Sequence, residues 1–368
     1  MEDINFKPEE PNGFYHTLVT RVGEYFDSNN LSRKSNAYGR FKVFLFLCIY
    51  ATLLVAIYMA DGNVVQLLTA FTVLGFIQIC CALIMGHEGV HGSFSKNKKV
   101  NKALSYAFDM VGTSGYLWGL RHVHSHHPYP MIPEHDVDIQ QQSGLIVFHP
   151  QEEPAPGLKY QYLYAPFLYI FYTLMVVFKR DYLDFISNKI GNKVINHKRK
   201  EYIELGVMKT LYFVHVLILP LVLSGVHWGW VLLGFVIMHF VESLTAATAL
   251  FPAHLYEESI FPRPDKERKM ERTWAEHQIA VTMDFGTRWQ IVGFFFGGIN
   301  YHMVHHLFPM VSHVHFHTIQ KILIQTCKDF GLHYNHEPHL HRAILSHFKL
   351  LRRNGLSRTA VHHMAEVI

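Results

Sequence analysis

The chain has 368 residues, of which 49% are hydrophobic, 14% aromatic and only 17% charged. Charged residues usually make up about a quarter of a soluble domain, so this composition argues against a plain soluble protein. The formal net charge of +4 is too small for a strong polyanion-binding field, and we expect no nucleic-acid partner. Histidine is the unusual residue, because its 28 copies nearly equal the 29 acidic residues, and imidazole is a common ligand of transition metals.

Two long apolar regions indicate membrane-spanning helices. The first, 43–86, is interrupted by a short polar break at 61–63, and the second, 207–249, is interrupted at 224–225. A bilayer core about 30 Å thick needs roughly 20 helical residues to cross, so each region is long enough for two spans. The sequence therefore predicts two transmembrane hairpins with tight turns.

Lys and Arg residues flank both hairpins on the side away from the turns, and the turns carry none. Because Lys and Arg are enriched on the cytoplasmic side of membrane spans, that side is predicted to be cytoplasmic. The segment 1–42 is then a cytoplasmic N-terminal segment, and 87–206 and 250–368 together form a cytoplasmic domain. We predict an all-α protein with four transmembrane helices and a cytoplasmic helical domain, placed in a bacterial inner membrane with both termini in the cytoplasm.

The stretch 160–178 is apolar and aromatic, with Lys159 at one end and Lys179-Arg180 at the other. Basic residues at both ends are typical of a helix that lies in the membrane interface. A full span would instead invert the orientation of every later segment. We favour the interfacial helix and keep the spanning helix as the alternative.

Histidines gather in three clusters at spacings that suit metal ligands. Side chains three or four residues apart share one face of a helix, so such pairs can point at one metal ion. The clusters are His87 and His91; His122, His124, His126 and His127; and His302, His305 and His306. In the second cluster, the spacing permits His122 with His126 or His124 with His127, and does not choose between them.

The predicted orientation brings all three clusters to the cytoplasmic side, whereas an odd number of spans between them would have separated them. Eight histidines, counting three from the second cluster, are too many for one metal ion, so two metals are expected. Nitrogen ligands exclude Mg and Ca and leave Fe, Zn, Cu or Ni. The sequence therefore predicts a cytoplasmic site for two transition-metal ions.

The clusters resemble the three histidine boxes of the membrane fatty acid desaturases and their hydroxylase relatives. Those boxes read His-x-x-x-His, His-x-x-x-His-His and His-x-x-His-His. The matching residues are His87 and His91; His122, His126 and His127; and His302, His305 and His306. Gly92-Ser93-Phe94-Ser95, Trp118, and the run from Gly297 to Pro309 are also similar to the family. The resemblance extends from about residue 14 to about residue 330.

The resemblance implies a ninth ligand, His254 in an Ala-His pair, and places His124 outside the ligand set. It implies two iron ions, dioxygen as co-substrate, and electrons from an external ferredoxin or haem-protein donor, since the sequence has no His-Pro-Gly-Gly haem signature. Residues next to the ligands can orient imidazoles through their free N–H groups. The candidates for such contacts are Asp136, Asp138, His277 and Asn300.

The activity implied by the resemblance is desaturation of a fatty acyl chain that is linked to a lipid, coenzyme A or a carrier protein. An acyl chain offers no polar handle near the reacting carbons, so an apolar tunnel is required. Tyr116, Trp118 and Tyr301 are candidates to line it, with ordinary packing as the alternative. Many relatives that desaturate near the carboxyl end have Gln where this chain has His302, which weakens that assignment of the bond position.

Two alternatives remain. A hydroxylase on the same scaffold would carry the same histidines and would insert oxygen into the acyl chain. A membrane metal-binding or transport protein would instead carry its histidines along a path within the spans, whereas these clusters lie outside them.

Overall fold

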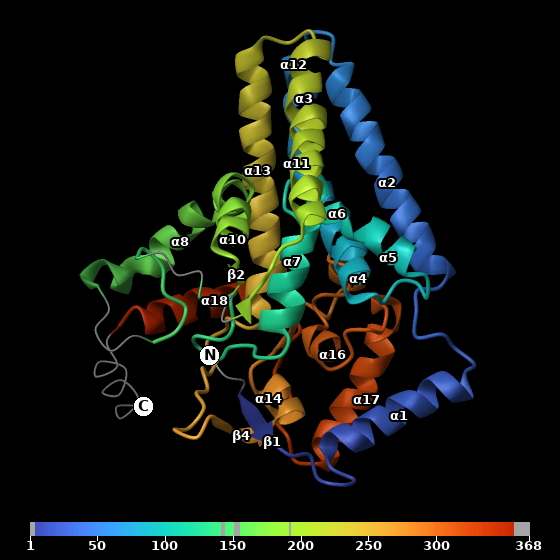
Figure 1. Ribbon diagram of the computed structural model, residues 1–368, viewed down its shortest axis with the longest axis vertical. Coiled ribbons are helices and arrows are strands. Elements are labelled where there is room, and N and C mark those ends of the chain that lie inside the picture. The colour runs from blue at the N-terminus through green and yellow to red at the C-terminus, as the bar shows by residue number, and fades with distance from the viewer. Residues whose placement is uncertain (1–3, 141–143, 151–154, 191–192, 357–368) are drawn as a thin grey trace.

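The computed structural model describes residues 4–140, 144–150, 155–190 and 193–356. Long helices stand together at one end of the molecule, and shorter helices gather at the other end (Figure 1). Four helices in the described part are long and apolar enough to cross a membrane: Ala37–Tyr58, Val64–His91, Arg199–Leu223 and Trp228–Ala253. The prediction of a helical membrane protein with four spanning helices is confirmed.

The first hairpin pairs α2 (Ala37–Tyr58) with α3 (Val64–Cys81). Both helices begin at an asparagine N-cap. The side chain of Asn36 accepts a hydrogen bond from the backbone of α2, and that of Asn63 accepts one from the backbone of α3. Each cap satisfies a backbone N–H that has no partner inside the helix, so the polar break at 61–63 ends one helix and starts the next.

The second hairpin consists of α11 (Arg199–Phe213), a π turn at Val214–Ile218, α12 (Leu219–Leu223) and α13 (Trp228–Leu250). Pro220 lies at the start of α12. Proline has no backbone N–H and its ring clashes with the carbonyl four residues earlier, so the helix widens locally before it. The third span is therefore one continuous but irregular helix.

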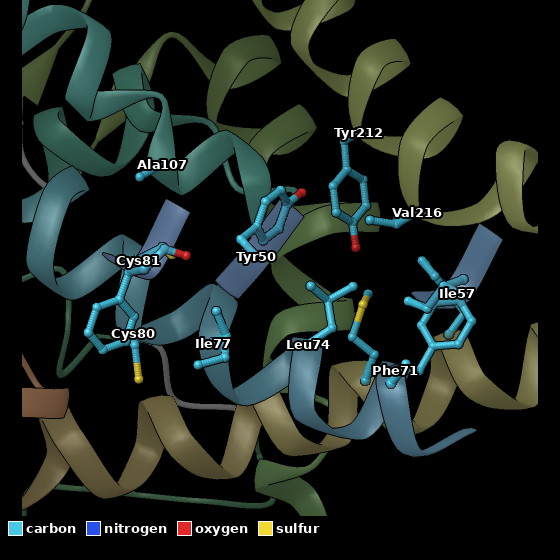
Figure 2. Close-up of a cluster of buried hydrophobic side chains, with 14 of the residues drawn as sticks. Tyr50, Ile57, Phe71, Leu74, Ile77, Cys80, Cys81, Ala107, Tyr212 and Val216 are labelled. Atoms are coloured by element: carbon cyan, nitrogen blue, oxygen red, sulfur yellow. The ribbon is translucent and has the colours of Figure 1, made fainter. Parts of the chain in front are cut away.

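The two hairpins pack together through α3 and α13. A Cβ added at Gly75 would lie 2.3 Å from the Met238 carbonyl oxygen, and one added at Gly234 would lie 2.4 Å from the Phe71 ring. Gly75 lets the two helix backbones approach closely, and Gly234 leaves room for the Phe71 ring. Side chains that fill the core around this contact include Tyr50, Phe71, Leu74, Tyr212 and Val216 (Figure 2). The close contact fixes the C-terminal ends of α3 and α13 relative to each other.

The shorter helices form a helical cap at the end away from the hairpin turns (Figure 1). They are α1 (Phe14–Ser28), α4 (His87–His91), α5 (Lys98–Ser105), α6 (Ala107–Met110), α7 (Gly115–Arg121), α14 (Trp274–Ala280), α15 (Gln290–Phe295), α16 (His302–Leu307), α17 (Phe316–Asp329) and α18 (Leu340–Asn354). Strands pair in parallel as β1 (Asn5–Lys7) with β4 (Lys269–Thr273) and β5 (Asp284–Phe285) with β6 (His336–Glu337), and antiparallel as β2 (Lys189–Ile190) with β3 (Lys193–Val194). Segments from both ends of the chain thus meet in the cap.

The stretch expected to be interfacial forms two helical arms, Pro156–Tyr169 and Tyr172–Ser187, bent by 74°. We call them the bent segment, which contains α8 (Gln161–Tyr169), α9 (Tyr172–Met175), a π turn (Val176–Arg180) and α10 (Asp181–Ser187). One face exposes large apolar side chains along both arms: Tyr160, Leu163, Phe167, Phe171, Met175 and Phe178. An exposed apolar stripe suits contact with lipid. The segment makes a fifth span only if both arms together cross the membrane, so the choice between span and interface stays a prediction.

A buried carboxyl group, Asp109 in α6, contacts the start of α7, where its Oδ2 accepts a hydrogen bond from Gly115 N at 3.2 Å. Burial raises the pKa of Asp109 from its usual 3.8 to about 7. The folded state therefore binds a proton more tightly than the unfolded state, and stability falls as the pH rises from about 4 to about 7. We expect Asp109→Asn to raise the melting temperature at pH 8, with a gain that shrinks towards pH 4. An equal gain at every pH would contradict this.

Candidate metal centre

The first histidine cluster lies at the end of the second spanning helix. α3 continues through a π turn, Ala82–Gly86, into α4, so that His87 and His91 extend directly from the membrane span. Gly92 ends α4 with a left-handed φ of 65°, a conformation that glycine adopts without steric cost. The position of this cluster is therefore set by the packing of α3.

The second cluster follows α7, which continues into a π turn at His122–His126. The side chains of His122, His126 and His127 are buried, whereas His124 is exposed. A π turn adds a residue to the helical repeat and rotates the side chains that follow it. The structure thus turns the family-matching histidines inward and leaves His124 in solvent.

The third cluster occupies α16, where His302, His305 and His306 are all buried. His254 lies just beyond the fourth spanning helix, after a 3-10 turn at Phe251–Ala253. The fourth span therefore positions one histidine, His254, in the cap, just as the second span positions His87 and His91.

All nine histidines that match the family pattern converge in the cap. Two groups of four each have ligand nitrogens within 4.8 Å of one another. The groups are His87, His91, His122 and His305; and His126, His254, His302 and His306. His127 forms a further group with His305 and His306, and so lies between the two. His122 and His126 are four residues apart on one helical stretch but belong to different groups of four. Their spacing alone does not predict this division.

The separations between ring nitrogens suit shared cations. Two nitrogens bound to one transition-metal ion at about 2.1 Å, with roughly 90–110° between them, lie about 3.0–3.4 Å apart. In the first group, His87 Nε2 lies 3.2 Å from His122 Nε2 and 3.1 Å from His305 Nε2. In the second, His302 Nε2 lies 3.0 Å from His254 Nε2 and 3.1 Å from His306 Nε2. These imidazoles are arranged as donors around two centres.

Several imidazoles are oriented by a hydrogen bond from Nδ1, which leaves Nε2 directed at the cluster. His254 Nδ1 donates to the Val281 carbonyl at 2.9 Å, and His302 Nδ1 donates to the Ile299 carbonyl at 3.0 Å. Such bonds fix the tautomer and the ring orientation of a metal-binding histidine. Backbone carbonyls of the cap therefore hold these two rings with Nε2 directed at the other imidazoles of the cluster.

The two carboxylates expected near the imidazoles differ in their contacts. Both oxygens of Asp136 lie 3.1 Å from His126 Nδ1, and the oxygens also accept from Met131 N and Asp138 N. The side chain of Asp136 is 0% exposed, whereas that of Asp138 is 44% exposed and lies 3.6 Å from His126 Nδ1. Asp136 is thus the carboxylate that orients His126.

His277 and Asn300, the other two expected neighbours, are buried but do not hydrogen-bond the nine imidazoles. His277 Nε2 donates to the Pro130 carbonyl at 2.8 Å, and so holds the chain that follows the second cluster. Among the described residues, the side-chain amide of Asn300 has no hydrogen-bond partner. Its backbone carbonyl accepts from Phe285 N at 3.0 Å.

Gln278 and Asp284 contact the clusters and were not among the expected residues. Gln278 Oε1 accepts from His306 Nδ1 at 2.8 Å, while its Nε2 donates to the His127 carbonyl at 3.2 Å. Asp284 Oδ1 accepts from Met303 N at 2.8 Å and so caps the start of α16. The only sequence signal for Gln278 was its place beside His277, one of the expected residues.

Burial controls the charge of the cluster. It lowers the pKa of His122, His127 and His305 well below the usual value, and neighbouring imidazoles lower it further. Neutral imidazole is the form that binds metal. At His126, burial also lowers the pKa, but the carboxylate of Asp136 outweighs burial and raises the pKa to about 9. Without a bound cation the His126 ring therefore carries a proton on both nitrogens; a metal ion would displace the proton on Nε2, while Asp136 keeps the one on Nδ1.

The three aromatic residues expected to line a tunnel take different positions. The Trp118 ring lies over His122, with centroids 4.3 Å apart, and stacks on Phe108 at 3.9 Å. The Tyr116 hydroxyl lies 3.1 Å from His197 Nδ1, and the Tyr301 hydroxyl lies 3.3 Å from His317 Nδ1. Of the three, Trp118 packs against the centre.

Known proteins are similar to this chain over most of its length. The family model described as fatty acid desaturase matches residues 62–338. An acyl-lipid (8-3)-desaturase of Physcomitrium patens is 30% identical over 358 residues, which cover 96% of this chain and 74% of the relative. An sn-1 linoleoyl-lipid 6-desaturase of Synechocystis sp. is 29% identical over 93% of this chain and 96% of the relative. The chain therefore belongs to the fatty acid desaturase family.

Proposed function

We propose that this protein is an acyl-lipid desaturase that uses dioxygen and two iron ions to introduce a double bond into a lipid-linked acyl chain. The observation that carries the proposal is the convergence of nine buried imidazoles into two groups in a membrane protein of the desaturase family. Imidazole ligands suit iron, whereas Zn²⁺ has no redox chemistry and could not supply electrons.

The proposed ligands divide into a set of five and a set of four. His127 is assigned to the first set because its Nε2 lies 3.0 Å from His122 Nε2 and 2.9 Å from His305 Nε2. The first set is His87, His91, His122, His127 and His305. The second set is His126, His254, His302 and His306. The second set has fewer protein donors, which leaves more room there for small molecules.

Bound iron would supply the electron transfer that activates dioxygen. The overall reaction, R–CH2–CH2–R′ + O2 + 2 e⁻ + 2 H⁺ → R–CH=CH–R′ + 2 H2O, balances with electrons from a ferredoxin or haem protein. The residues of the chain hold and orient the imidazoles, and Trp118 excludes water from one side of His122. Exclusion of water protects a reactive site from side reactions.

The proposal places the metal centre and both termini in the cytoplasm, with 1–42, 87–206 and 250–368 on that side. Lys and Arg residues beside the spans support this orientation. The bent segment would then lie in the cytoplasmic leaflet, because both of its arms pack on the cap side of the hairpins (Figure 1). Transport is disfavoured because the nine clustered histidines lie at the helix ends and in the cap.

Expression in a host of known lipid composition, supplied with linoleate, tests the proposal. We expect a fatty acid two mass units lighter than its precursor, found by gas chromatography with mass spectrometry and located first in intact glycerolipids. A product heavier by one oxygen would instead identify a hydroxylase. The position of the new bond would show whether His302 is compatible with desaturation on the carboxyl side of an existing double bond.

A further inference from the structure

A buried ion network joins the bent segment to the helix that precedes the second histidine cluster. Asp181, in α10, is fully buried; its Oδ1 accepts from Arg121 Nη2 at 2.8 Å and its Oδ2 accepts from Lys209 Nζ at 2.9 Å. The same Oδ2 accepts from Ser114 N at 2.8 Å. Side chains and backbone from α7, α10 and α11 therefore meet at one carboxylate.

This carboxylate holds both ends of α7. Ser114 is the N-cap residue of α7, and Arg121 is its last residue, directly before the π turn that carries His122 and His126. A seven-residue helix fixed at both ends can neither slide nor rotate. The direction of the imidazoles that follow it consequently depends on the contacts of Asp181.

The network pairs cations with carboxylates but contributes little to stability by charge pairing alone. Arg121 Nε also donates to Asp184 Oδ2 at 2.6 Å, and Arg180 Nε lies 4.0 Å from the same oxygen, so that three cations face two carboxylates. Transferring charges from water into the protein interior costs much of the free energy that their pairing regains. Apolar side chains of similar volume often give the protein equal stability. Three directional bonds onto Asp181 do, however, define a single arrangement of the elements.

We propose that Asp181 is a positioning residue that sets the geometry of the second histidine cluster through α7. It touches none of the nine imidazoles, and it acts through Arg121 and Ser114. The inference rests on the proposed function, since it assumes that His122 and His126 bind metal. It also makes the bent segment, whose other face is apolar and exposed, a structural part of the metal centre.

Cobalt binding to Asp181→Asn tests the inference. The metal-free protein in detergent is titrated with Co²⁺, and the visible absorption gives both the affinity and the ligand geometry. We expect the folded variant to bind Co²⁺ at least about 10-fold more weakly, as is usual when support of a metal ligand is lost, and with a changed spectrum. Asp329→Asn is the matched control, because Asp329 pairs with Arg21 at a partly exposed site between α1 and α17.

Asp181→Asn leaves the buried guanidinium of Arg121 short of one partner, which can impair folding. The double variant Arg121→Gln with Asp181→Asn removes that charge, and we expect it to fold and to show the same weaker binding. Wild-type affinity and spectrum in either folded variant would overturn the inference. That result would leave the proposed function standing, whereas failure of wild-type protein to bind Co²⁺ at the histidines would remove the proposed function itself.

Discussion

His305→Ala abolishes product formation while the protein still inserts into the membrane. His305 is 1% exposed, and its Nε2 lies 3.1 Å from that of His87, 2.9 Å from that of His127 and 3.4 Å from that of His122. It therefore lies next to three other imidazoles of the first ligand set, and its loss removes a nitrogen donor that neighbours all three. We expect no detectable desaturated product and less bound iron, measured on purified protein by mass spectrometry of the metal.

His124→Ala is the matched control for this experiment. It removes a histidine from the same sequence cluster as His122, but one whose side chain is exposed to solvent. We expect wild-type product and wild-type iron content. Turnover by His305→Ala would disprove the two-iron assignment. Loss of iron from His124→Ala would show that the assignment of the ligands is wrong.

The spans and the clusters are readable from sequence because each depends on local composition. Charge-free runs and helical spacing persist whatever the chain packs against. The limits of the helices are harder to read from sequence: α2 begins at Ala37, before the apolar region that starts at residue 43, because the side chain of Asn36 caps it there. Lys42 is buried inside this helix and contacts His313 Nε2 at 3.2 Å. A charge pattern alone treats such a lysine as a flank.

The supporting residues could not be predicted, since their contacts cross long stretches of chain. Gln278 bonds His306, which is 28 residues away, and Asp181 bonds Arg121, which is 60 residues away. Nothing in the sequence around Asp181 distinguishes it from an ordinary charged residue at a helix start. The π turns at Ala82–Gly86 and His122–His126 are equally hidden, although they decide which way the imidazoles point.

The membrane helices are part of the metal centre and not merely its anchor. α3 leads without a break into His87 and His91, and α13 leads through one short turn into His254. Because Gly75 brings these two helices into backbone contact, the spacing of the first cluster from His254 is fixed inside the membrane. Substitutions at Gly75 are therefore expected to disturb metal binding far along the helix, through the clash with Met238.

Asp136→Asn lowers activity and metal affinity by about 10- to 100-fold, as expected for loss of a partner that orients a metal ligand. Asp136 Oδ1 lies within hydrogen-bond distance of His126 Nδ1 and Asp138 N, and Oδ2 of His126 Nδ1 and Met131 N. In either orientation, the amide NH2 of Asn would face a backbone N–H. A buried donor left facing a donor costs about 1–3 kcal/mol, so the side chain moves and His126 loses its fixed orientation.

Asp138→Asn separates this effect from a general loss of negative charge. The Asp138 carboxylate is half-exposed and lies 3.6 Å from His126 Nδ1, beyond a normal hydrogen bond, so its substitution should cost much less than that of Asp136. Iron content and the rate of product formation, measured on both variants at equal amounts of folded protein, give the comparison. A larger loss for Asp138→Asn would mean that the field of the carboxylates matters more than the contacts of Asp136. An equal loss in both would mean that His126 is held by the loop as a whole, with neither carboxylate decisive.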